Sequence, residues 1–290
     1  MPIFQIKNKK VAQVLFDLNY FSNEAALRDF FADNLEDLLG MRFWAKEYSI
    51  TDGRIDTLAI DETNAPVIIE YKWGENNTIL TQGLFYFDWL KENRPLFNLL
   101  VENRFGKKER VNWDNPRVIL IAQGFDRYTL AAVRRVKFVE LIKYVPYQQG
   151  ILFLETVHGP EISGPVQEEN GEEDRGERRG IEYHLHSVTN DVKKIFYTLQ
   201  EKIISLPGVS ERAEQKTGIT YRATKSFAYF KFGRTYIDIQ LREPKYRDPK
   251  RLVRDITHFR FGYKGAAKIR SLNEVDYMFD LIKQSYESTL

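Results

Sequence analysis

The chain has 290 residues, 43% of them hydrophobic, and it contains no cysteine. The absence of cysteine excludes disulfides, thiolate nucleophiles and any zinc site that needs sulfur ligands. No signal-peptide core opens the sequence, and no apolar stretch approaches the roughly 20 residues that span a bilayer. We therefore expect a soluble, cytoplasmic protein with no membrane partner.

Charge is unevenly distributed along the chain, although the whole carries a net charge of only +2. Residues 1–158 carry −1, residues 159–180 carry −4 and residues 181–290 carry +7. Ten basic residues stand against three acidic ones within 241–270. A basic surface of this kind attracts a polyanion such as the phosphate backbone of DNA, although an ordinary solvated face has the same composition.

Composition also predicts two domains joined by a linker. Residues 159–180 contain almost no apolar side chain and many Gly, Pro and charged residues, so they cannot contribute to a core. We predict a larger domain at 1–158, a flexible charged linker at 159–183 and a smaller basic α+β domain at 184–290.

The larger domain begins with a helix predicted within 22–40, where Leu and Phe side chains recur at helical spacing. Asn23 or the serine before it is a plausible N-cap, and Gly40 is a plausible stop. Strand-length runs with turn residues between them follow at 42–50, 53–61 and 66–73.

A helical pattern at 78–93 and a buried strand at 116–124 complete the order α-β-β-β-α-β, and a short helix with two more strands follows it. The predicted fold class is thus α/β with one mixed sheet, accompanied by a smaller α+β domain.

The smaller domain is predicted to contain an amphipathic helix from Val192 to Ile203, three strands between 219 and 242, and a terminal helix from Val275 to Tyr286. Asp248 and the proline after it predict the start of a short basic helix through Arg254. His184 and His186 are predicted to share one face of a solvated strand, without a metal.

Charged residues interrupt the apolar strands at 53–61 and 66–73. Side chains alternate between the two faces of a strand, so Glu70 and Lys72 point the same way. The short connection between the runs makes them antiparallel partners, which brings Asp56 beside the Glu70 end. Two carboxylates and one ammonium therefore converge at the edge of an apolar sheet.

Burying such a set is costly unless the charges compensate one another or bind an ion. The carboxylates of Asp56 and Glu70, with the backbone carbonyl of Tyr71, form a hard oxygen site that suits Mg²⁺ or Mn²⁺. A metal in this place polarises a phosphodiester and activates water, and Lys72 stabilises the charge that develops. A structural cluster of ion pairs is the alternative interpretation.

Three more residues are predicted to point toward this site. Gln82 and Tyr86 lie one helical turn apart on the helix that follows the Lys72 strand. Glu24 opens the first helix, where it either adds a carboxylate to the metal site or stabilises the helix macrodipole.

The order of Glu24, Asp56 in GRID, Glu70 and Lys72 in EYK, and Gln82 and Tyr86 in QGLFY resembles the PD-(D/E)xK nuclease superfamily, nearest to its RecB-type and NucS-like members. The resemblance covers roughly 22–125 and implies a restriction-endonuclease-like αβββαβ core. It further implies that Asp56 and Glu70 bind the metal, that Lys72 is catalytic, and that the Gln-xxx-Tyr motif contacts DNA and organises the site.

One position departs from the family pattern, since Ile55 stands where the family name has Pro. Residues from about 184 resemble an uncharacterised conserved domain often fused behind such nucleases. Homodimers are an expectation of the family, because single-site nucleases often pair to cut two strands.

The sequence thus predicts a metal-dependent DNA endonuclease with Mg²⁺ or Mn²⁺ as cofactor and DNA as partner. The basic domain is predicted to contact DNA through Arg251, Arg254, Lys264 and Lys268. A protein on a nuclease fold that binds nucleic acid or a partner without turnover stays open as the alternative.

Overall fold

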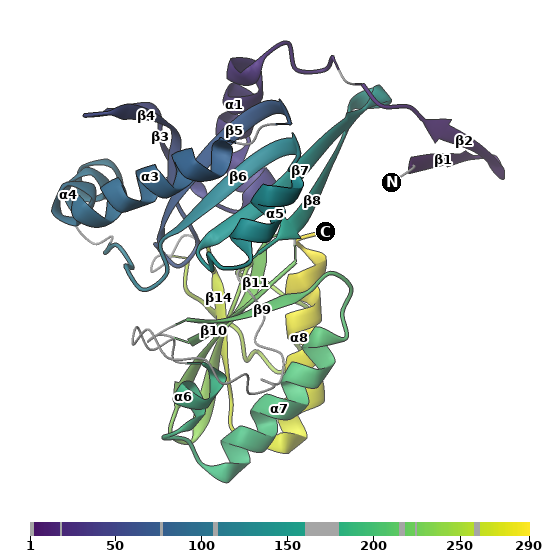
Figure 1. Cartoon of the computed structure of the whole chain (residues 1–290). Helices are drawn as coiled ribbons and strands as arrows, with labels where there is room; N and C mark the ends of the chain where they lie inside the picture. The colour runs from purple at the N-terminus through teal and green to yellow at the C-terminus, as the bar shows by residue number, and fades with distance from the viewer. Residues whose placement is uncertain are drawn as a thin grey trace.

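The computed structural model describes residues 3–17, 19–75, 78–106, 110–159, 180–214, 218–223, 225–257 and 262–290. Within these ranges the chain forms two six-stranded sheets and a separate two-stranded one (Figure 1). We call residues 19–159 the N-terminal unit and residues 180–290 the C-terminal unit. Most of the predicted linker, 160–179, lies outside the described residues, and the predicted domain boundaries stay a prediction.

The N-terminal unit is built on a mixed sheet with the spatial order β3-β4-β5-β6-β7-β8. Strands β3, β4 and β5 are antiparallel neighbours, β5, β6 and β7 run parallel, and β8 returns antiparallel to β7. The carboxyl ends of β5, β6 and β7 therefore lie together at one end of the sheet along the strand direction. This end is here called the carboxyl edge. The strands are β3 (Arg42–Ile50), β4 (Gly53–Ile60), β5 (Pro66–Glu75), β6 (Arg117–Gly124), β7 (Val139–Tyr147) and β8 (Ile151–His158).

Helices cover both faces of this sheet through two apolar clusters. The short helices α1 (Glu24–Asp33) and α2 (Leu35–Leu39) cover one face, and α3 (Ile79–Glu92), α4 (Arg94–Phe105) and α5 (Arg127–Val133) cover the other. Helix α1 starts where predicted, because the Asn23 side chain accepts a hydrogen bond from the Ala26 N–H at 2.8 Å. Gly40 ends α2 at φ 71°, a left-handed conformation that glycine adopts without strain.

The C-terminal unit is an antiparallel sheet with the spatial order β13-β14-β12-β11-β10-β9. Helices α7 and α8 pack against one face of it through a large apolar cluster. The elements are α6 (Ile181–Leu185), α7 (Asn190–Ile204), β9 (Ser210–Glu214), β10 (Gly218–Arg222), β11 (Ser226–Gly233), β12 (Tyr236–Leu241), β13 (Arg254–Asp255), β14 (Gly265–Ile269) and α8 (Val275–Glu287).

The predicted order α-β-β-β-α-β is confirmed from α1 to β6, with α2 and α4 as additional helices. The mixed sheet beside a smaller α+β unit confirms the predicted fold class. None of the helices in the described ranges is both long and apolar enough to cross a bilayer.

Two local predictions in the C-terminal unit were wrong. His184 lies in helix α6 rather than in a strand, because its ring packs at 5.9 Å from the ring of Phe232 and is buried there. Residues 248–253 form a loop rather than a helix. The carboxylate of Asp248 accepts the Val253 N–H at 2.7 Å, and Arg251 adopts a φ of 53°, which no right-handed helix contains.

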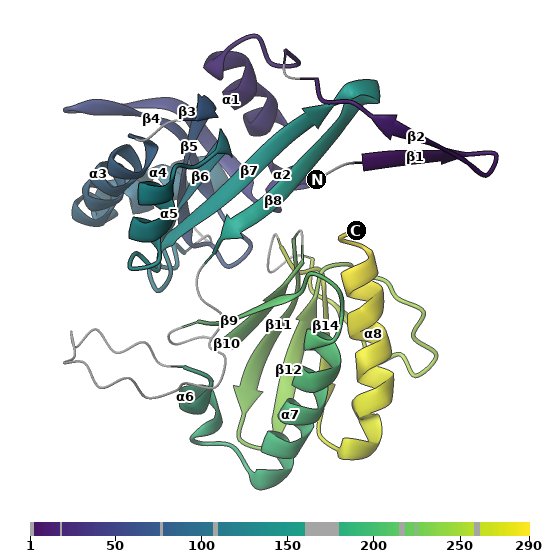
Figure 2. The same cartoon turned by 45° about the vertical axis from the view of Figure 1, so that its right-hand side comes forward.

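An additional element precedes the N-terminal unit and was not predicted. Strands β1 (Ile3–Lys7) and β2 (Lys10–Val14) form a hairpin that stands away from both units (Figure 2). We call residues 3–17 the N-terminal arm. Its root is fixed by an isolated bridge between Phe16 and Tyr147, at the tip of the β7–β8 ribbon.

Helix α3 packs closely on strand β6 because it has a glycine at the contact. A Cβ atom on Gly83 would lie 2.9 Å from Leu120 Cδ2 and 2.9 Å from Val118 Cγ1, inside ordinary contact distance. The glycine therefore sets the distance between helix and sheet, and with it the positions of Gln82 and Tyr86 on the same helix.

We predict that Gly83→Val lowers the free energy of unfolding by about 1–3 kcal/mol, because the added methyl groups must push α3 off the buried strand. Urea denaturation followed by circular dichroism measures the change. Ala131→Val on the exposed face of α5 is the matched control and should cost less than about 0.7 kcal/mol. Equal losses in the two variants would contradict the close-packing explanation.

Candidate active site

The cross-strand pairing between β4 and β5 stops at Thr57 and Ile69, one residue before Asp56 and Glu70. Beyond this point the strands separate. The Asp56 N–H donates to Oε1 of Glu70 at 3.0 Å, and the Tyr71 N–H donates to Oδ2 of Asp56 at 3.1 Å. The two carboxyl groups thus replace the main-chain partners that the separating strands lose, and this replacement holds them side by side.

The carboxyl groups of Asp56 and Glu70 are neighbours, because the Glu70 carboxyl accepts the Asp56 N–H and the Asp56 charge acts on it. Glu70 is only 2% exposed, and burial together with the neighbouring Asp56 charge raises the pKa of Glu70 to about 9. Burial raises the pKa of Asp56 as well. The two groups, called the acid pair below, therefore share a proton at neutral pH.

Lys72 is held beside the acid pair by a carboxylate from another element. Its Nζ donates to Oε1 of Glu24 at 2.8 Å, and the Trp73 N–H lies 3.5 Å from Oε2 of the same group. Glu24 is the first residue of α1, so the helix and the end of β5 meet through this bond. Because Glu24 matches the lysine charge, the acid pair keeps its own excess of negative charge.

Tyr86 borders the acid pair. Burial and the nearby Glu70 charge raise the pKa of the Tyr86 hydroxyl, and the backbone of Arg54 hydrogen-bonds to it. One turn earlier on the same helix, Oε1 of Gln82 is buried and has no hydrogen-bond partner among the described residues. An enclosed acceptor without a donor is a place where a ligand group or water binds.

The acid pair fits the predicted divalent cation by its chemistry. Two adjacent carboxyl groups, one of them protonated at neutral pH, offer hard oxygen donors to Mg²⁺ or Mn²⁺, which would take the place of the proton. The described residues contain no group of three or more His, Cys, Asp or Glu that could hold a metal ion. The protein would thus supply Asp56 and Glu70, and the carbonyl of Tyr71 stays a prediction.

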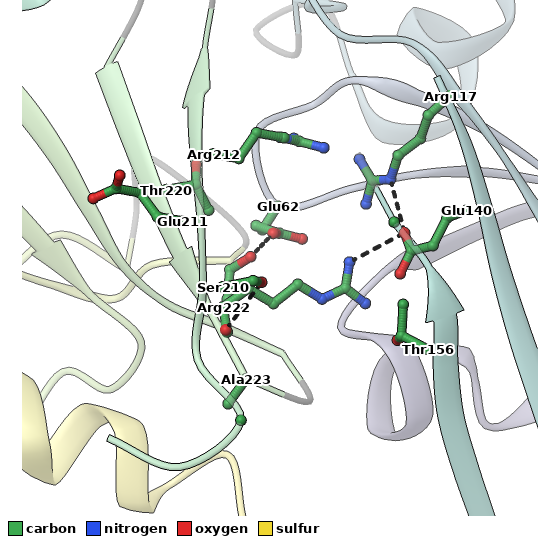
Figure 3. A pocket seen from close by; sticks show the side chains of 13 residues that line it. Glu62, Arg117, Glu140, Thr156, Ser210, Glu211, Arg212, Thr220, Arg222 and Ala223 are labelled. Atoms are coloured by element: carbon green, nitrogen blue, oxygen red, sulfur yellow. Dashed lines mark hydrogen bonds and ion pairs between the residues drawn. The ribbon is translucent and has the colours of Figure 1, made fainter. Parts of the chain in front are cut away.

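A second charged cluster surrounds a cavity of about 320 Å³ between the two units (Figure 3). Arg117 on its wall pairs with Val67, five residues before Lys72 along β5. At about 3.3 Å per residue this separates the cavity from the carboxyl edge by roughly 17 Å. The C-terminal unit therefore contacts the edge of the mixed sheet that is opposite to the acid pair.

Ion pairs cross this interunit cavity. Arg117 binds Asp61, whose Oδ2 also lies 3.8 Å from Arg212 of the C-terminal unit. Glu140 lies 3.8 Å from both Arg117 and Arg222. Burial alone would raise the pKa of Asp61, but the Arg117 and Arg212 charges outweigh burial and hold it below its ordinary value. These ion pairs join the two units. Glu62, which lines the same cavity, is buried, and burial and the neighbouring Asp61 charge raise its pKa.

Sequence reasoning missed the residues of the interunit cavity. Asp61 follows strand β4 and Arg117 begins strand β6, and charged residues at strand ends usually face solvent. They are buried only because the C-terminal unit covers them, and no local pattern in the sequence signals that covering.

The four predicted DNA-contacting residues lie at the β13–β14 side of the C-terminal unit. Arg254 donates to Asp238 at 2.8 Å, and Lys268 Nζ lies 4.7 Å above the ring of Tyr236. Lys264 is half-buried beside β14, and Arg251 is exposed. Since their unit contacts the opposite edge of the mixed sheet, these residues do not line the acid pair.

Comparison with known proteins gives a match to each part of the chain. Residues 181–289 match a family model described as a domain of unknown function, DUF5655. An uncharacterized protein of Haemophilus influenzae is 26% identical over 302 aligned residues, which cover 98% of this chain and 99% of that protein. That alignment therefore spans both units.

Two solved structures share a limited likeness. A repair endonuclease from Pyrococcus abyssi is 19% identical with a TM-score of 0.30, and the match covers 43% of this chain and 48% of that one. A structure of an EndoMS complex with double-stranded DNA is 14% identical with a TM-score of 0.27, covering 48% of this chain and 62% of that one.

We predict that the metal-free protein loses stability as pH rises from about 5 to 9. Folded Glu70 keeps its proton up to a pKa of about 9, whereas unfolded Glu70 releases it near its ordinary value of 4.5. The folded state thus binds more protons across this window, so raising the pH favours unfolding. Glu70→Gln should remove this loss and raise Tm at pH 8 by at least about 2 °C.

Thermal unfolding at pH 5 and pH 8 in EDTA measures this effect. Glu92→Gln, at the exposed end of α3, is the matched control and should leave both Tm values unchanged. A Tm for Glu70→Gln that falls below wild type at pH 8 would show that the carboxyl group is stabilising rather than strained.

Proposed function

We propose that the N-terminal unit is a metal-dependent DNA endonuclease that hydrolyses phosphodiester bonds. The observation that carries this proposal is the acid pair, which shares a proton beside Lys72 at the carboxyl edge. A buried pair of carboxyl groups with excess negative charge is costly to keep for stability alone. A site that binds a divalent cation explains why the charges are there.

Each residue of the site has a role in this proposal. Asp56 and Glu70 hold Mg²⁺ or Mn²⁺, which when bound supplies Lewis-acid polarisation of the phosphate and a water of lowered pKa. Lys72, fixed by its 2.8 Å bond to Glu24, stabilises the negative charge that develops on the phosphate. Tyr86 and Gln82 border the site and contact the DNA strand. The bond to Glu24 holds Lys72 in one position, so less free energy is spent on ordering the lysine when the transition state forms. Positioning Lys72 is therefore the proposed function of Glu24.

The order of these residues along the chain supports the same proposal, since it is the order found in the PD-(D/E)xK nucleases that the sequence resembles. The chemistry acts on the phosphodiester and reads no base edge, so the site favours DNA cleavage without specifying a sequence. Two copies of the chain would be needed to cut both strands at one place.

We predict that wild-type protein cleaves supercoiled plasmid in the presence of Mg²⁺ or Mn²⁺ and not in EDTA. Asp56→Asn and Lys72→Ala should each lower the cleavage rate by at least about 100-fold, because they remove a metal ligand and the charge that stabilises the transition state. Gel electrophoresis of linear and nicked products measures the rate, and Glu92→Gln and Lys194→Ala on exposed helix surfaces are the matched controls.

Mg²⁺-dependent cleavage that survives in both Asp56→Asn and Lys72→Ala would rule out this site. DNA binding by wild type without any metal-dependent product on plasmid, single-stranded, branched or mismatched DNA would favour a binding protein without turnover.

The C-terminal unit is proposed as an additional DNA contact, carried by Arg251, Arg254, Lys264 and Lys268. Charge reversal at Arg251 and Arg254 should reduce the steepness of log affinity against log salt by about 1 or more. Each phosphate contact that is lost reduces this slope by about 0.9. Fluorescence anisotropy with a labelled duplex over a range of salt concentrations measures the slope. An unchanged slope would remove this surface from the proposal.

A further inference from the structure

The N-terminal arm exposes its large apolar side chains on one face. In the pairing of β1 with β2, Phe4 and Ile6 lie on the same face as Val11, which is opposite Ile6. They are 53%, 74% and 63% exposed, respectively. A two-stranded hairpin without a packed face is marginally stable in water, so this face is suited to a partner.

The arm also carries an excess of positive charge. Residues 3–17 contain three lysines, Lys7, Lys9 and Lys10, and one acidic residue, Asp17 at the root, although the predicted larger domain as a whole carries −1. The three lysines gather at the turn, are exposed, and make no ion pair in the described part of the chain. The tip is therefore a cationic point that none of the described residues neutralises.

The turn keeps a lysine where the backbone favours glycine. Asn8 and Lys9 have φ values of 50° and 62°, the two left-handed positions of a tight hairpin turn. A residue with a Cβ atom, such as Lys9, is strained in this conformation relative to glycine. Because lysine is strained at this position, its presence there indicates that the positive charge has a function.

The arm begins at the same edge of the sheet as the acid pair. Lys72 pairs with Ala122, and Ala122 pairs with Lys143 on β7. Strand β7 continues four residues further to Tyr147, where the arm is attached, which is about 13 Å beyond the row that contains Lys72. Strands β5 and β7 are two positions apart, or about 10 Å. A duplex seated at the acid pair passes the root of the arm.

We propose that the N-terminal arm is a DNA-binding ribbon that grips the duplex on which the acid pair acts, an inference that rests on the proposed nuclease function. A two-stranded ribbon fits a groove of B-DNA about 12 Å wide. The lysines at the tip contact phosphates, and Phe4, Ile6 and Val11 pack against sugars and base edges.

The arm is tested in the full-length protein with a triple variant, Lys7→Gln, Lys9→Gly and Lys10→Gln. Glycine at position 9 suits the turn, so the hairpin is retained while three charges are removed. In EDTA, fluorescence anisotropy with a labelled 30-base-pair duplex should show affinity lowered by about tenfold or more and a salt slope reduced by about 2.7. The matched control removes Lys91, Lys137 and Lys194, three exposed lysines outside the arm, and should change the slope less.

Plasmid cleavage at saturating DNA separates the arm from the acid pair. The triple variant should cleave within about twofold of wild type once DNA is saturating, because it leaves Asp56, Glu70 and Lys72 intact. Wild-type cleavage together with unchanged affinity and slope in the triple variant would overturn the arm proposal alone. Absence of both DNA binding and cleavage in wild type would overturn the nuclease function and the arm proposal together.

The apolar face is tested by Ile6→Thr with Val11→Thr, which keep β-branched side chains in the strands. This variant should lose DNA affinity without a change in salt slope and should sediment as wild type does. Conversion of a wild-type dimer into a monomer, with DNA affinity unchanged, would show that the face binds a second copy and would overturn the proposal.

Discussion

A charge imbalance at the end of two strands is the constraint on which the rest of this structure depends. Glu24, Asp56 and Glu70 meet near a single ammonium, that of Lys72, where β4 and β5 separate. Lys72 satisfies Glu24, so Asp56 and Glu70 can remain together only with a proton or another cation between them. The sheet tolerates this cost because the surrounding apolar clusters fix both strands.

The carboxyl groups at the two ends of the mixed sheet have different partners. In the interunit cavity, Asp61 and Glu140 each face two arginines, and those pairs hold the C-terminal unit in place. At the carboxyl edge, the acid pair is left without its own cation. Carboxyl–arginine pairs of this kind are typical of an interface, whereas a carboxyl pair without a cation is typical of a site that receives a charged ligand.

The positions of the N-terminal unit, the C-terminal unit and the N-terminal arm follow from these two edges of the mixed sheet. The C-terminal unit occupies the edge with the arginines, which leaves the carboxyl edge open, and the β7–β8 ribbon carries the arm past that open edge (Figures 1 and 2). In the proposed function, the phosphate backbone of DNA is attracted to the positive charge at the tip of the arm, and a divalent cation at the acid pair allows the same backbone to approach the two carboxyl groups.

The sequence alone determined the order of elements and the meeting of Asp56 with Glu70. Helical and alternating spacing predicted α1, β3, β4, β5, α3 and β6 close to their observed bounds, because their apolar faces repeat with the period of each element. The placement of Asp56 beside Glu70 also followed from the sequence, since a short connection forces antiparallel pairing. These features depend on contacts between neighbouring segments.

Only the tertiary structure decided the remaining features. It paired Lys72 with Glu24, which is 48 residues away, buried Asp61 and Arg117 under the C-terminal unit, and placed His184 in a helix against Phe232. It also set the arm apart as a ribbon on the β7–β8 tip. Each of these features depends on which surfaces meet after the helices and strands have formed. The local pattern around a residue does not specify which distant surface will neutralise its charge, cover it or support it.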